Sequence, residues 1–70
     1  MLIYFKDVVS GGSVAINPKH IVAIFESTEE GEHKGKTVIS VVTGGTLITD
    51  ESQLDVVGKI NGELNQWVNH

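Results

Sequence analysis

Residues 37–49 read TVISVVTGGTLIT, and this stretch decides the fold. Two runs rich in β-branched residues, Thr37–Thr43 and Thr46–Thr49, flank the pair Gly44-Gly45. β-Branched residues favour strands, and adjacent glycines supply the positive φ angles that tight hairpin turns require. The stretch therefore predicts two antiparallel strands joined by a two-residue turn.

A second hairpin is predicted at the N-terminal end of the chain. Leu2–Val9 is dense in apolar and aromatic residues, Gly11-Gly12 supplies a turn, and Ser13–Ile16 provides the return strand. Asn17-Pro18 ends that strand, because proline cannot donate a ladder hydrogen bond. A third strand is predicted over His20–Glu26. Its alternation places Ile21, Ala23 and Phe25 on one face and Val22 and Ile24 on the other. Since both faces are apolar, we expect this strand to be central or covered on both sides.

A single helix is predicted over Ser52–Trp67, with Ser52 as its N-cap. Spacing successive residues by 100° gathers its apolar side chains in one sector. Gly58 and Gly62 lie at the edge of the polar face, where each costs the helix about 1 kcal/mol relative to alanine. They are either a smooth patch that a partner backbone can approach or tolerated weak points of the helix. The sheet-facing sector contains Val56, Val57, Ile60, Leu64, Trp67 and Val68.

Together these elements predict one α+β domain over residues 1–70. It consists of a small antiparallel β-meander of about five strands, with two tight hairpins and a curled sheet, and one C-terminal α-helix. A chain of 70 residues has a thin core, and the absence of cysteine excludes disulfides. No basic leader or membrane-length apolar run is present, so we expect a cytoplasmic protein that does not insert into a membrane.

Charge bears on the class of partner. The formal net charge is −4, and all five basic residues are lysines. Nucleic-acid binding depends on clustered cations and favours arginine, so direct binding of nucleic acid is disfavoured. A basic protein surface remains a suitable partner.

The densest group of possible metal ligands lies in the polar, glycine-punctuated segment Ser27–Lys36. It lacks the Asp-x-Asp-x-Asp-Gly spacing of a calcium loop, and the histidines show no zinc-ligand pairing. We interpret the segment as a solvated hairpin loop and predict no metal, cofactor or catalytic residues, and hence no enzyme. Its carboxylates are candidate partner-binding residues, together with the two helix glycines: Glu29, Glu30, Glu32, Gly58 and Gly62.

A set of strand, turn and cap residues recurs in one known family. These residues are Ile16-Asn17-Pro18, Ile21, Ile24, Glu26, Thr37, Ile39, Val41, Gly45, Glu51-Ser52, Val57 and Lys59-Ile60. In this pattern the chain resembles the FlbD-type family of small bacterial flagellar and swarming-motility proteins, and the pattern also occurs in short phage-encoded proteins. The resemblance covers Val14–Leu64, although the segment before Asn17 and the Ser27–Lys36 loop are longer than the family pattern. It implies a small non-enzymatic domain and transfers no catalytic residue.

Two functions follow as hypotheses. The first is a protein-interaction module of the FlbD-like kind that binds a larger cellular assembly. The alternative is a small acidic phage-encoded inhibitor of a host protein, occupying the basic site of a DNA-binding protein. One helix covers only one face of a sheet, so we also expect a homodimer or higher oligomer. Its candidate contacts are Val38, Val42 and Trp67.

Overall fold

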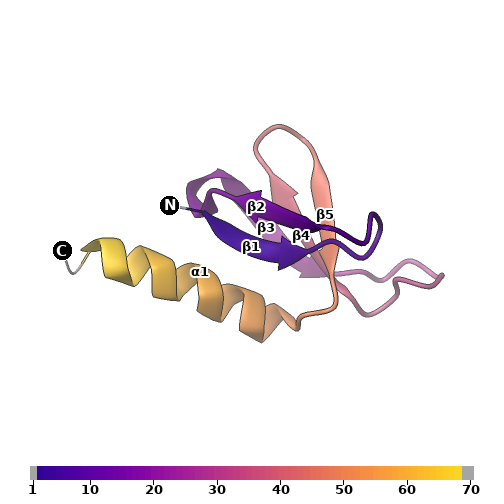
Figure 1. Ribbon diagram of the computed structural model, residues 1–70. Helices are drawn as coiled ribbons and strands as arrows, with labels where there is room; N and C mark the ends of the chain where they lie inside the picture. The colour runs from indigo at the N-terminus through magenta and orange to yellow at the C-terminus, as the bar shows by residue number, and fades with distance from the viewer. Residues whose placement is uncertain (1, 69–70) are drawn as a thin grey trace.

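A computed structural model describes the backbone of residues 2–68 and the side chains of residues 2–62. The order of elements along the chain is strands, one short 3₁₀ helix, more strands and one α-helix (Figure 1). Their bounds are β1 Ile3–Lys6, β2 Ser13–Ile16, η1 Pro18–His20, β3 Ile21–Glu26, β4 Thr37–Val41, β5 Thr46–Thr49 and α1 Gln53–Val68.

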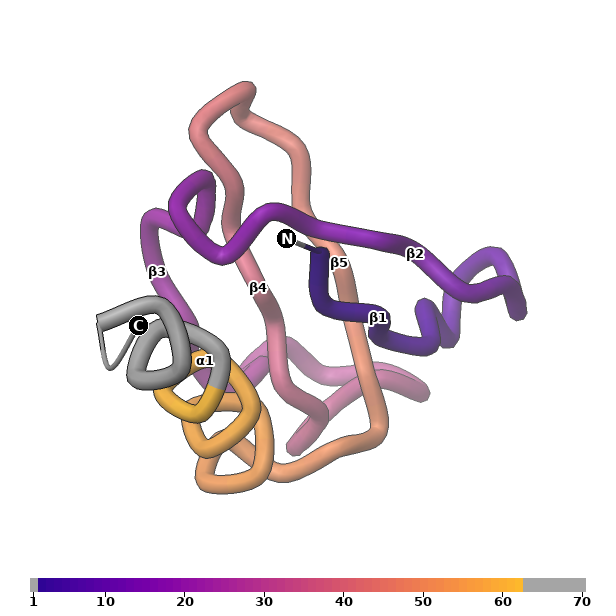
Figure 2. The backbone as a smooth tube through the Cα atoms, turned by 60° about the vertical axis from the view of Figure 1, so that its left-hand side comes forward, coloured from indigo at the N-terminus to yellow at the C-terminus, as the bar shows by residue number. Residues whose placement is uncertain are grey.

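The predicted α+β fold with five antiparallel strands and a C-terminal helix is confirmed, but the strands form two sheets instead of one. β1 pairs with β2, and β3, β4 and β5 form a three-stranded meander in that order. Figure 2 shows the β1–β2 hairpin lying across the three-stranded sheet. The two sheets meet where the Val8 N–H donates to the Ile48 carbonyl over 2.8 Å. The chain thus packs its strands as two small layers.

The core lies between these two layers and the helix. Phe5, Ile39 and Val56, from β1, β4 and α1, are almost completely buried, at 1%, 0% and 0% exposure. Alternation along each strand directs these side chains inward, so each element contributes one apolar face. The buried cluster comprises Ile3, Phe5, Ile16, Ile39, Leu47, Val56 and Ile60.

The prediction that the third strand is central or covered on both sides is wrong, because β3 is an edge strand of its sheet and four of its six side chains are exposed. Its predicted faces also change. A register irregularity between Ile21 and Ala23 adds one residue to β3 relative to β4. Such a bulge reverses the alternation, which places Ile21 on the same side as Ile24. Both pack against the core, whereas Phe25 is exposed.

Both predicted hairpin turns are present, with glycines at positive φ. Gly11 has φ 78° and its N–H donates to the Asp7 carbonyl over 2.8 Å. Gly44 has φ 92° and its N–H donates to the Val41 carbonyl over 2.9 Å. The prediction of a two-residue turn at Gly44-Gly45 is wrong, because β4 ends at Val41 and the connection spans residues 42–45. β1 likewise ends at Lys6, earlier than predicted, since Asp7 already belongs to the turn.

The helix begins as predicted. The Asp55 N–H donates to the Ser52 hydroxyl over 3.1 Å, which is an N-cap bond. Val56 and Ile60 are buried on the core side, while Val57 is 39% exposed. The side chains of Leu64, Trp67 and Val68, also predicted for this sector, lie outside those that the structure describes.

Ile39, which is buried in β4, and Val42, which follows the end of that strand, should respond differently to substitution. Ile39→Ala should lower the free energy of unfolding by about 2–5 kcal/mol, because it leaves a cavity in the core. Val42→Ala should change it by less than about 0.5 kcal/mol, since Val42 is 59% exposed. Urea denaturation followed by circular dichroism measures both. Equal losses for the two variants would contradict the described core.

Candidate functional site: a groove beside β2

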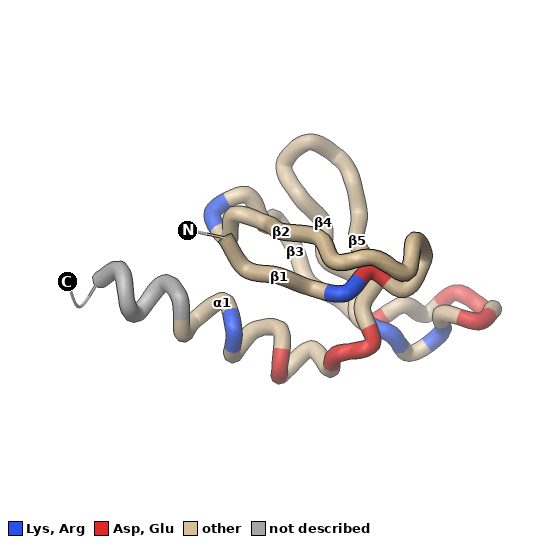
Figure 3. Tube along the Cα trace, in the orientation of Figure 1, with Lys and Arg blue, Asp and Glu red and all other residues tan. Residues whose placement is uncertain are grey.

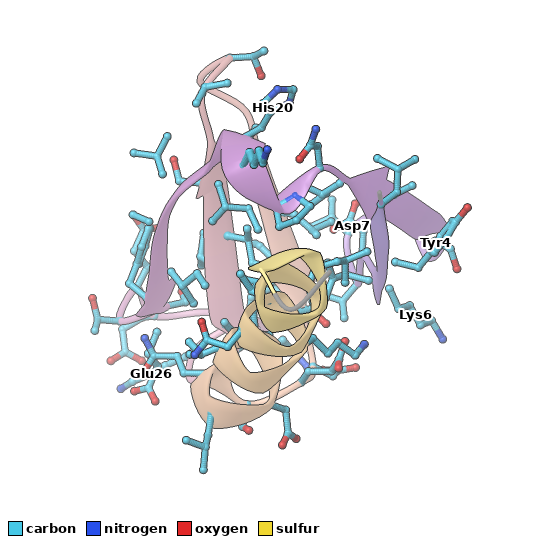
Figure 4. The ribbon with its side chains drawn as sticks, turned by 90° about the vertical axis from the view of Figure 1, so that its left-hand side faces the viewer. Tyr4, Lys6, Asp7, His20 and Glu26 are labelled. Atoms are coloured by element: carbon cyan, nitrogen blue, oxygen red, sulfur yellow. The ribbon has the colours of Figure 1, made fainter. Side chains whose placement is uncertain are left out.

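The helix closes one side of the two-layer structure. It contacts both β1 and β3, and it lies in front of the strands in Figure 4. One polar side chain of the helix reaches each of these two strands. Lys59 Nζ donates to the Tyr4 carbonyl over 3.4 Å, and Gln53 Nε2 donates to the Ile24 carbonyl over 3.3 Å. Each acceptor is a backbone group that its own sheet leaves unpaired at an edge. The helix therefore covers the outer edges of both β1 and β3.

Lys59 is held in this position by further contacts. Its Nζ lies 2.8 Å from Glu51 Oε1 and 5.0 Å from the centroid of the Phe5 ring. A spacing of four residues along a helix would instead allow Lys59 to pair with Asp55 or with Glu63. The pair with Asp55 is absent among the described side chains, and Glu63 lies outside them. Lys59 thus links the helix to β1 through contacts with residues outside the helix.

On the opposite side none of the described helices and strands fills the space between the layers. β2 and the β4–β5 hairpin, which rises above it in Figure 1, bound a groove of about 330 Å³. Its far end is formed by η1, where the Val42 N–H donates to the His20 carbonyl over 2.9 Å. The lining residues are Asp7, Val14, Ala15, Ile16, Asn17, His20, Val41, Val42, Thr43, Gly45, Thr46 and Leu47.

The floor of the groove is apolar and continuous with the core. Ile16 and Leu47 are buried, and Val14 and Val41 are half-buried against the core cluster. No residue of β2 or of the β4–β5 hairpin carries a charge, as Figure 3 shows. A volume of about 330 Å³ accommodates one or two large apolar side chains and lies at the lower end of the small-molecule range. The groove is suited to side chains of a peptide.

Of the Asp, Glu and Lys residues whose side chains the structure describes, only Asp7 lines the groove. Its carboxylate accepts N–H groups of Val9 and Ser10 at 3.3 Å and of Ile48 at 3.4 Å. Partial burial acts to raise the pKa of this carboxyl. The hydrogen bonds from the Ser10 side chain and from the three backbone groups together lower the pKa below its ordinary value. Asp7 is therefore ionised at neutral pH and joins the first hairpin to β5.

A second hollow of about 300 Å³ lies on the face of the three-stranded sheet that points away from the core. Phe25, Val38 and Ile48 form one cross-strand row there. Phe25 is 46% exposed, whereas Val38 is only 8% exposed between its two neighbours. The acidic residues Glu26 and Glu29 line the same hollow. This row, with these carboxylates beside it, is a second candidate surface.

The predicted partner-binding carboxylates lie in the exposed loop between β3 and β4. Lys34 Nζ pairs with Glu30 Oε1 at 2.7 Å, and His33 Nε2 lies 3.5 Å from Glu32 Oε1. Glu29 lies beside the second hollow. Among the described residues, no group of three or more acidic or histidine side chains is placed to hold a metal ion. The loop thus presents negative charge without forming a chelating site.

The remaining predicted residues are dispersed. A Cβ at Gly58 or Gly62 would meet nothing within 4 Å, so close packing within the chain does not require either glycine. Val42 is 59% exposed at the groove, while little of Val38 is left for a partner. The side chain of Trp67 lies outside the described residues. No helix in the described part of the chain is long and apolar enough to span a membrane.

Sequence reasoning missed the groove. Its walls come from segments about 30 residues apart, β2 and the β4–β5 hairpin, and both had been assigned only as strands. The one available signal was the absence of charge from residues 37–49 and 8–18. Such runs are also typical of buried strands, so the signal does not distinguish a groove from a core.

The lowered pKa of Asp7 predicts a pH dependence of stability. Its contribution is fully present above the ordinary value of 3.8 and is lost as the pH falls through the lower value of the folded chain. Asp7→Asn should therefore lose less stability than the wild type between about pH 5 and pH 2.5. Urea denaturation at a series of pH values measures this. Parallel curves for the two proteins would contradict the role of Asp7, whereas some residual slope is expected from Asp50, whose pKa is also lowered by its bond with Lys36.

Comparison of this chain with protein-family models, curated proteins and solved structures found no match.

Proposed function

We propose that this chain is a non-enzymatic protein-interaction module. The observation that carries the proposal is the amount of apolar surface that its own elements leave uncovered. Single exposed apolar side chains are ordinary on a protein surface, whereas one beside a hollow with apolar lining marks a candidate interaction site. The exposed large apolar side chains are Leu2, Tyr4, Val9, Val22, Phe25, Val42, Leu54 and Val57.

Phe25 is the strongest single anchor on this surface. An aromatic ring that is 46% exposed beside Val38 and Ile48 offers a partner a large contact area. Aromatic anchors dominate the energy of protein interfaces. Glu26 and Glu29 lie next to this ring, so the matching surface is an apolar knob with a basic rim. Charge complementarity of this kind raises the association rate and selects among partners.

The resemblance to FlbD-type proteins supports a role in a larger bacterial assembly. It rests on strand, turn and cap residues, which specify a scaffold more than a binding site. The module is proposed to act in the cytoplasm and without a cofactor.

One observation favours the alternative function, an acidic inhibitor of a DNA-binding protein. Carboxylates gather along the β3–β4 loop and around the start of α1, at Asp50, Glu51 and Asp55 (Figure 3). A surface of this sign can occupy a cationic site that otherwise binds phosphates. Displacement of duplex DNA from the captured partner would favour the inhibitor over the assembly module.

The proposal predicts specific capture of a protein. Immobilised wild-type chain should retain a protein from a bacterial extract, and mass spectrometry identifies it. Capture should fall for Phe25→Ser and for the combined Glu29→Gln, Glu30→Gln and Glu32→Gln variant, because each removes part of the complementary surface. Leu54→Ser is the matched control, since Leu54 is 82% exposed on the helix. Retention of no protein above an unrelated acidic domain would contradict the proposal.

Self-association is a separate proposal with its own prediction. A homodimer would cover part of the exposed apolar surface and compensate for the thin core. Light scattering at tens of micromolar should then give at least twice the 7.6 kDa mass of the chain. Val42→Asp should split the dimer without unfolding it, because Val42 is exposed. A particle of the mass of one chain would contradict self-association.

A further inference from the structure

The outer edge of β5 meets the first hairpin at Val8. The remaining strand edges belong to β1, β2 and β3, and they differ in how they are covered. On β3, Gln53 donates a hydrogen bond to the Ile24 carbonyl. The bulge in the same strand also makes its edge irregular, which hinders the pairing of another strand. Lys59 occupies the Tyr4 carbonyl on β1. β2 has no such cover among the described residues. An exposed edge with unpaired backbone groups is a template for another strand.

The register of the first hairpin identifies the unpaired groups of β2. Asp7 N–H donates to the Gly12 carbonyl over 2.8 Å, so positions 7 and 12 form a hydrogen-bonded pair. Such pairs alternate along an antiparallel ladder. Tyr4–Ala15 and Lys6–Ser13 are therefore pairs without mutual hydrogen bonds. The backbone N–H and C=O groups of Ser13 and Ala15 consequently point away from β1, toward the open side of β2.

The groove begins at this edge. Ala15 is exposed and lines it, and Val14, on the core side of the same strand, forms part of its floor with Val41 and Leu47. An added strand would place alternate side chains toward this floor, because side chains alternate across a strand. Main-chain hydrogen bonds and an apolar side-chain pocket thus lie within reach of one segment, which is the arrangement used in strand addition.

Charge specifies the segment further. Among the described residues, Asp7 is the only Asp, Glu or Lys in the lining, and an occupant would remove water from around it. A charge that loses water requires an opposite charge or strong hydrogen bonds. The three backbone bonds that Asp7 accepts are long, at 3.3–3.4 Å, and the Ser10 side chain also donates to it. None of these donors carries a charge, so a cation of the occupant is the group that can offset the charge of Asp7.

From these contacts we propose that the groove binds an extended segment of a partner protein, which adds as a strand to β2. The segment places an aliphatic or aromatic side chain on Val14, Val41 and Leu47 and a lysine or arginine at Asp7. This inference rests on the proposed protein-binding function and names its site and the chemistry of its partner.

A random dodecapeptide library displayed on phage is the probe. Panning on the wild-type chain should enrich peptides with one apolar position and a nearby basic position. Panning on Asp7→Asn should enrich the apolar position without the basic one, because the neutral amide keeps an acceptor but loses the charge. A basic preference that persists on Asp7→Asn, or no enrichment on the wild-type chain, would overturn the proposal.

Two variants test the site with synthetic versions of the enriched peptides. Ala15→Pro removes an outward N–H without removing a ladder bond to β1. Val42→Glu puts a charge on the groove wall and leaves the strand edge intact. Each should raise the Kd at least about tenfold in fluorescence polarisation, which corresponds to the loss of one or two net hydrogen bonds or their equivalent. Val22→Glu is the matched control, since Val22 is 63% exposed on β3, away from the groove.

The outcomes separate this inference from the function on which it rests. If a captured protein partner depends on Phe25 but binds Ala15→Pro and Val42→Glu as tightly as the wild type, protein binding stands and the groove proposal is wrong. If Ala15→Pro does not fold, Val42→Glu alone decides. Unchanged peptide affinity for Val42→Glu would overturn the proposal.

Discussion

The packing of Val56 and Ile60 of α1 against the two sheets is the interaction on which the rest of the structure depends. Neither sheet can enclose a core alone, because a two-stranded hairpin is marginal in water and three strands have one face to cover. The helix lies between β1 and β3 and buries both side chains against Phe5 and Ile39, among others. Its polar side chains then reach the two neighbouring strand edges. The helix thereby closes the apolar core and also binds one carbonyl on the edge of β1 and one on the edge of β3.

This arrangement leaves an asymmetry. A two-layer structure has two open sides, and one helix fills only one of them. The side bounded by β2 and the β4–β5 hairpin stays open, which is why the floor of the groove is continuous with the core. The same shortage of elements explains the exposure of Phe25, since no second helix in the described part of the chain covers the outer face of the three-stranded sheet. In a domain of this size, uncovered surface is a consequence of chain length as well as a feature that partners can use.

Asp7 connects the fold to the groove. Its carboxylate holds the first turn through Val9 and Ser10 and reaches β5 through Ile48. The same group is the acidic residue in the described lining of the groove, whose floor is apolar. A residue that stabilises the junction between the sheets is therefore also placed to select the charge of an occupant. The acidic β3–β4 loop is exposed to solvent, where salt screens the interactions of its charges beyond roughly 8–10 Å.

Local rules were sufficient for much of this fold. β-Branched runs, paired glycines, Asn17-Pro18 and the Ser52 cap predicted the strands, the turns and the start of the helix, because each depends on conformational preferences of neighbouring residues. The sequence by itself also determined the acidic loop and the uncharged character of residues 37–49. Tertiary structure decided the division into two sheets, the edge position of β3 and its bulge, and the four-residue connection after Val41. It also decided the attachment of Lys59 to Tyr4 and Glu51 and the opening beside β2. These features depend on which distant segments of the chain meet. Contacts between segments far apart in the sequence leave no periodic pattern in it, so neighbouring residues alone do not predict such contacts.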